Sequence, residues 1–62
     1  KFPIKFTFQL TDEQALAFAQ FLKRAGFNDY RQCAASDDEA YLMRDAADRI
    51  RDALAEAGYA PR

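Results

Sequence analysis

The predicted fold depends on the stretch at residues 2–10, which reads FPIKFTFQL. Every even position in this stretch is apolar, and every odd position is proline or polar. This period of two is typical of a strand that buries one face. No second run of comparable alternation follows in the chain, and a strand needs a neighbour for its backbone hydrogen bonds. We therefore expect residues 2–10 to pair with the same segment of a second copy, as an intermolecular two-stranded ribbon.

A first helix is predicted directly after this strand. Thr11 caps its first amide groups, and Gln14 lies where its side chain completes a capping box. We expect the helix to span residues 12–25. Gly26 follows it and suits the left-handed conformation just beyond a helix end.

A second helix is predicted in the C-terminal half of the chain. Ser36 and Glu39 have the spacing of another capping box, and the helix is expected at residues 37–57. The connection between the two helices, residues 26–35, is long for a helix pair and leaves room for a short helical turn.

The first predicted helix is apolar over about 220° of its circumference, whereas one core face needs a stripe of a little over 100°. Two surfaces must therefore cover it. We predict an α+β fold that is mainly α, with a β-α-α protomer forming a single domain over residues 1–62 and completing its core as a homodimer. The residues predicted to form the core and the dimer interface are the large apolar ones of the strand and helices: Ile4, Phe6, Phe8, Phe18, Phe21, Leu22 and Leu54.

The length of the chain also favours association. A domain of 62 residues buries only about 60% of the surface that its unfolded form exposes, so its stability is marginal. Small domains are usually stabilised by disulfides, metals or oligomerisation. The single cysteine, Cys33, and the absence of histidine leave oligomerisation. One cysteine without a disulfide framework indicates a reducing compartment, so we expect a cytoplasmic protein.

The sequence contains no set of residues that predicts catalysis. A chain of one strand and two helices has little interior in which to hold a nucleophile, base or metal. Its carboxylates lack the spacing of a calcium loop, and no segment approaches the roughly 18 apolar residues of a membrane span. We expect no enzymatic activity, no cofactor, no metal and no membrane partner. Tyr41 projects from the polar side of the second predicted helix and is a candidate contact for a partner.

A strand followed by two helices resembles the ribbon-helix-helix repressors in topology. In that family the outward residues of the paired ribbon enter the major groove of DNA. The resemblance implies that Lys5, Thr7 and Gln9 contact bases. The segments LTDEQA, AQFLKR and ALAEAGYAPR also look similar to short uncharacterised bacterial proteins, some from mobile elements. This second resemblance implies a bacterial or phage origin and assigns no activity.

Charge favours a protein partner over DNA. The helix start Asp37-Asp38-Glu39 would repel phosphates, and the isoelectric point near 5.2 provides no positive field over the whole molecule. The leading hypothesis is a protein-interaction module that forms a homodimer and also binds another protein. A ribbon-helix-helix-like, DNA-binding transcriptional regulator is the alternative.

Overall fold

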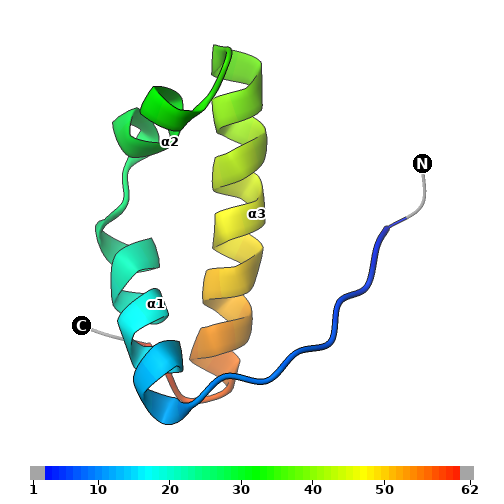
Figure 1. The fold of residues 1–62 in the computed structure, drawn as a ribbon, viewed down its shortest axis with the longest axis vertical. Helices are drawn as coiled ribbons and strands as arrows, with labels where there is room; N and C mark the ends of the chain where they lie inside the picture. Colours follow the sequence, from blue (N-terminus) through cyan, green and yellow to red (C-terminus); the bar gives the residue numbers. More distant parts are fainter. Residues whose placement is uncertain (1–2, 61–62) are drawn as a thin grey trace.

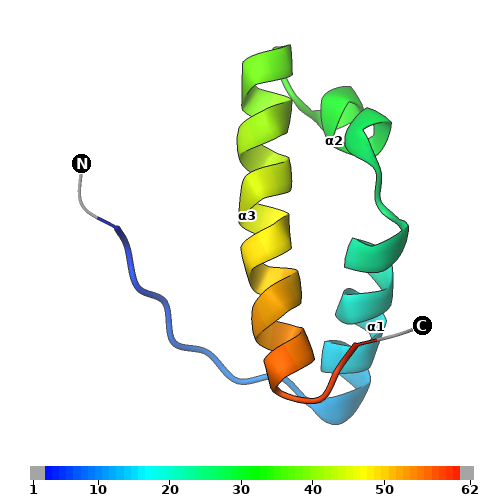
Figure 2. The same cartoon turned by 180° about the vertical axis from the view of Figure 1, so that it is seen from behind.

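The computed structural model describes residues 3–60, and this part of the chain forms three helices. They are α1 (Asp12–Arg24), α2 (Phe27–Cys33) and α3 (Asp37–Glu56). The helices α1 and α3 lie side by side and run in opposite directions, and α2 lies across the upper end of α3 (Figures 1 and 2). Both α1 and α2 pack against α3.

The predicted strand is wrong. Residues 3–10 form no strand, and Phe2, the first residue of the predicted strand, lies outside the described residues. This segment, which we call the arm, leaves the start of α1 and runs away from the helices (Figure 1). Its backbone makes no hydrogen bond to another described residue. A strand is defined by its pairing, and the rest of residues 3–60 is helical or turn and provides no partner. The fold is therefore all-α, and the α+β class and the β-α-α protomer are corrected.

Helix α1 begins at the residues that the sequence indicates. The Gln14 amide donates to the Thr11 hydroxyl at 3.1 Å, and the Thr11 amide donates to the Gln14 side chain at 3.0 Å, so the capping box is present. The helix ends differently from the expectation. Gly26 has a φ of −109° and is the N-cap of α2, where its amide donates to the Asp29 carboxylate at 2.8 Å. The chain passes from one helix to the next through extended residues, without a left-handed glycine.

The connection expected at residues 26–35 contains the seven-residue helix α2. Two contacts fasten it to α3. The Arg31 guanidinium lies 2.6 Å from the Asp37 carboxylate and also donates to the Ala34 carbonyl at 3.0 Å. The ring of Phe27 packs against that of Tyr41, with 4.7 Å between ring centroids. These contacts give a short helix a fixed position that its length alone would not provide.

Helix α3 is closed at both ends by local hydrogen bonds. At its start the Glu39 amide donates to the Ser36 hydroxyl at 3.2 Å, while the Glu39 side chain accepts from the Ala35 amide rather than from Ser36. At its end the Tyr59 amide donates to the Leu54 carbonyl at 2.8 Å, and Gly58 has a φ of 102°. This is a Schellman motif, in which a left-handed glycine reverses the chain. Tyr59 is thereby returned toward the core.

Alanine dominates the core between α1 and α3. The buried apolar residues of the described chain are Ala15, Ala19, Leu22, Ala40, Ala47 and Leu54. Small residues at a helix contact let the backbones approach closely, but they remove little apolar area from water. No described helix is long and apolar enough to cross a membrane.

Candidate interaction groove

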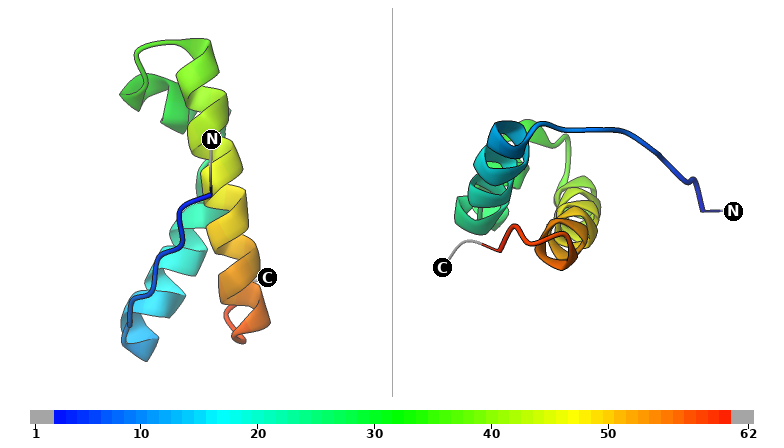
Figure 3. Two further views of the ribbon diagram at one scale, coloured as in Figure 1. Left: turned by 90° about the vertical axis from the view of Figure 1, so that its right-hand side faces the viewer. Right: turned by 90° about the horizontal axis from the view of Figure 1, so that it is seen from below.

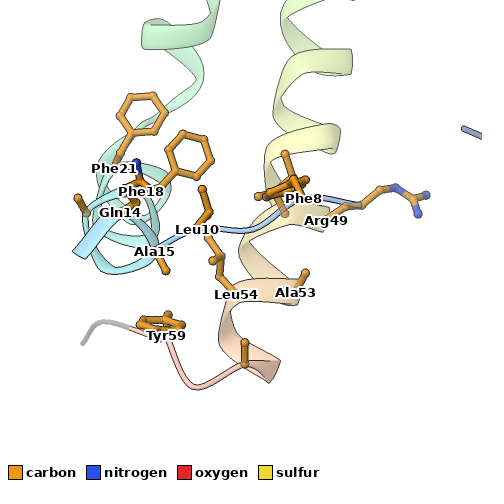
Figure 4. A pocket seen from close by; sticks show the side chains of 13 residues that line it. Phe8, Leu10, Gln14, Ala15, Phe18, Phe21, Arg49, Ala53, Leu54 and Tyr59 are labelled. Atoms are coloured by element: carbon orange, nitrogen blue, oxygen red, sulfur yellow. The ribbon is translucent and has the colours of Figure 1, made fainter. Parts of the chain in front are cut away.

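An apolar groove opens between α1 and α3 beside the alanine core, with a volume of about 1100 Å³ (Figure 4). The buried residues where α1 faces α3 are mostly alanines, and the two helices cross at an angle, so that their lower ends lie apart (Figure 3). The larger side chains that flank the contact therefore do not meet across it. They line an open groove instead of filling a core.

One wall of the groove comes from α1. Gln14, Ala17, Phe18 and Phe21 lie at positions i, i+3, i+4 and i+7, which places them on one face of the helix. The rings of Phe18 and Phe21 stack with 5.6 Å between centroids and an angle of 25° between planes. They are 41% and 52% exposed, so each ring presents about half of its surface to solvent. The two phenylalanines are the largest apolar groups in this wall.

The opposite wall comes from the C-terminal half of α3. Ile50, Ala53, Leu54 and Ala57 lie on the face turned toward α1. Leu54 is buried at the base of the groove, whereas Ile50 is 38% exposed. Arg49 stands at the rim, and its guanidinium points away from the groove (Figure 4). The lining of this wall is therefore aliphatic.

The last two residues of the arm that carry large apolar side chains, Phe8 and Leu10, also line the groove. Leu10 lies between the two walls, and Phe8 lies beside α3 (Figure 4). They remain 67% and 43% exposed. The arm therefore lies in the groove where it joins α1, and its residues nearer the N-terminus lie outside the groove.

Tyr59 closes the lower end of the groove. Its hydroxyl donates a hydrogen bond to the Asp12 carboxylate at the start of α1, and its ring packs against the alanine and leucine core. The hydrogen bond to Asp12, with smaller contributions from desolvation and from the negative charge of Asp12, raises the pKa of Tyr59 above its ordinary value. A phenol is already neutral at physiological pH, and the hydrogen bond to Asp12 favours this neutral form further. This contact joins the end of α3 to the start of α1.

The residues predicted from the sequence to form the core and interface separate into three groups. Leu22 and Leu54 are buried in the single chain. Phe8, Phe18 and Phe21 line the groove and are partly exposed. Ile4 and Phe6 lie on the arm outside the groove and are 77% and 76% exposed.

The other candidate residues lie apart from the groove. Lys5, Thr7 and Gln9 are exposed on the arm, and without a strand in residues 3–60 they form no ribbon. Tyr41 is 48% exposed; one side of its ring packs on Phe27, and the Arg44 guanidinium lies 5.2 Å from the ring centroid. Contacts within the chain therefore occupy part of the surface that was considered for a partner.

Sequence reasoning did not identify Leu10, Ile50 or Tyr59 as members of a site. Ile50 lies on one helix face with the buried Ala47 and Leu54, so its spacing is as typical of a core residue as of a site residue. Tyr59 follows Gly58, and a tyrosine directly after the left-handed glycine of a helix end is expected to fold back onto the last turn. That spacing was the available signal for the lower end of the groove.

Within residues 3–60, no group of three or more histidine, cysteine or carboxylate side chains is arranged to hold a metal ion. The polar side chains that line the groove are Gln14, Arg49 and Tyr59. An open apolar surface with polar groups at its rim is the composition of a surface that binds other apolar surfaces.

These features define a small all-helical domain with an open apolar groove. The chain belongs to the family described as Family of unknown function (DUF7706), whose model matches residues 1–62. No curated protein and no solved structure matches the chain. The family match agrees with the resemblance to uncharacterised small proteins.

Proposed function

We propose that the chain is a small interaction module that pairs with a second copy of itself through the groove between α1 and α3, and that it has no catalytic role. The observation that carries the proposal is the exposed area. A compact folded chain of 7.1 kDa is expected to expose about 4,100 Å². This chain exposes 5542 Å². The surplus of about 1,400 Å² exceeds the roughly 800 Å² that each partner buries in an interface of standard size.

Part of this surplus exposed area is apolar and lies in the groove. Phe8, Phe18 and Phe21 line the same groove and are between 41% and 67% exposed. Soluble monomers rarely leave large contiguous apolar patches in water, and such patches mark interaction sites. The groove is thus the surface that a partner would cover.

The weakness of the core supports a second copy as that partner. Four of the six buried apolar residues in the described chain are alanines, so one chain alone gains little from burial. Oligomerisation is a usual way to stabilise so small a domain, and a symmetric dimer is the commonest form. Pairing through the groove would add phenylalanine and isoleucine side chains to the buried set.

The groove residues also support a non-catalytic role. Among the described residues, the groove lining contains no histidine, cysteine, lysine or carboxylate, and the Tyr59 hydroxyl already donates to Asp12. The proposal includes a cytoplasmic location. The exposed lone thiol of Cys33 supports it, since such thiols are oxidised or cross-linked in oxidising compartments.

Light scattering during size-exclusion chromatography, over a series of protein concentrations, tests the proposal. We expect twice the 7.1 kDa mass of one chain. Ile50→Ser is expected to raise the dimer dissociation constant at least about tenfold, because it removes a side chain buried on pairing. Leu16→Ser is the matched control, since Leu16 is 46% exposed and does not line the groove.

Two results would contradict the proposal. A wild-type chain that stays monomeric throughout the series would exclude pairing. Equal effects of Ile50→Ser and Leu16→Ser would show that pairing uses another surface. Duplex DNA added to the same samples at low and moderate salt tests the DNA-binding alternative, which stays a prediction.

A further inference from the structure

The arm carries large, exposed apolar side chains that lie outside the groove. Ile4 and Phe6 are 77% and 76% exposed, more than any other large hydrophobic residue in the described chain. The arm leaves the lower end of α1, passes beside the last turns of α3 and continues away from the helices (Figures 1 and 3). Ile4 and Phe6 do not line the groove of their own chain.

The arm has the residue pattern of a segment that lies on an apolar surface. In an extended backbone, alternate side chains point to opposite faces. Ile4, Phe6, Phe8 and Leu10 therefore share one face, and Lys5, Thr7 and Gln9 share the other. The apolar face matches the groove in character, and the polar face suits solvent.

We infer that the arm of each copy lies along the groove of the other copy, with Ile4 and Phe6 against Phe18, Phe21 and Ile50 of that copy. This inference rests on the proposed pairing of two copies and names the segment that occupies the groove. The arm here docks on helices through its side chains, and it forms no strand.

The dimensions fit this arrangement. Eight extended residues span about 26 Å at about 3.3 Å per residue, and the longest dimension of the molecule is 33 Å. The arm can therefore follow most of the length of a second copy. Phe8 and Leu10 already line the groove of their own chain, so the arm starts at the surface where the two copies would meet. The exchange is reciprocal and closes after two copies, because each chain gives one arm and receives one.

Disulfide trapping between two different chains tests the inference. Both chains carry Cys33→Ser, which removes the exposed native thiol. One chain, enlarged by a tag, carries Phe6→Cys, and the other carries Ala53→Cys in the groove wall. The control partner carries Ala55→Cys, which is exposed on the same helix and does not line the groove. A second arm variant, Ile4→Cys, keeps Phe6 in place.

We expect the mixed disulfide to form severalfold faster with Ala53→Cys than with Ala55→Cys, with both arm variants. If the wild-type chain is a dimer in light scattering but the disulfide forms equally fast with Ala53→Cys and Ala55→Cys, the arm exchange is overturned and the proposed pairing stays intact. A wild-type monomer in light scattering would overturn the pairing itself. A single chain carrying both Phe6→Cys and Ala53→Cys, oxidised at high dilution, gives a third result. Rapid closure within that chain would show that the arm folds back on its own groove, which also overturns the exchange.

Discussion

Replacing Leu22 by alanine tests whether the contact between α1 and α3 is the core of the domain. Leu22 is 5% exposed and packs with Leu54 and three alanines. Leucine-to-alanine changes in cores cost about 2–5 kcal/mol, and the cost is larger where neighbours cannot fill the space. The neighbouring alanines cannot do so. We therefore expect a loss of about 3 kcal/mol in the free energy of unfolding, which is comparable with the roughly 3–5 kcal/mol that a single core provides at this size.

The assay is urea unfolding followed by helical circular dichroism at one fixed protein concentration, because pairing would make stability depend on concentration. Leu16→Ala is the control. Leu16 is 46% exposed on the same helix, so the same chemical change should cost well under half as much there. Equal shifts in the two unfolding midpoints would refute the placement of the core between α1 and α3.

Two further predictions concern residues at the ends of the helices. Gly58→Ala should destabilise by about 1 kcal/mol, because Gly58 has a φ of 102° and an added Cβ meets only backbone strain. Gly26→Ser should be neutral or slightly stabilising, since Gly26 is an N-cap with a negative φ, serine is favoured at N-caps, and the added Cβ would lie 3.9 Å from Asp29; equal thermal midpoints for the two variants would contradict the Schellman motif. The neutral Tyr59 phenol bonds to Asp12 and has a raised pKa, so its contribution to stability is present below pH 10 and is lost as the pH rises through the raised value. The late-ionising phase of the tyrosinate absorbance should be smaller in Tyr59→Phe than in the wild type, and indistinguishable late phases would count against the bond.

The helix ends could be predicted from the sequence because each end depends on only a few neighbouring residues. The exchange of hydrogen bonds between Thr11 and Gln14 needs only four residues in order. Gly26 shows the limit of such local reasoning. It suits the end of one helix, but it also precedes Phe27 and Asp29, and the Asp29 carboxylate that accepts from its amide makes it the start of α2. Two local signals competed for one residue, and the sequence did not rank them.

The strand at residues 2–10 was mispredicted for a different reason. Alternation specifies which side chains share a face once the backbone is extended. It does not specify that another backbone lies alongside, and pairing is what makes an extended segment a strand. The exposed apolar face of the arm is therefore the part of the prediction that depends on the residues alone. The strand was an inference about a neighbour that residues 3–60 do not contain.

The groove was only partly accessible from the sequence, since its position depends on how α1 crosses α3. The wide apolar arc of the first helix indicated that more than one surface must cover it, and Phe18 and Phe21 lie on the part that α3 leaves open. Ala15, Ala19 and Ala47 decide which part that is, because they let the helices meet at a narrow contact and keep the phenylalanines outside it. The same alanines thus limit the stability of one chain and create the surface that would bind a second. If this coupling holds, the free energy of unfolding rises with protein concentration, and a change that weakens pairing also weakens the fold.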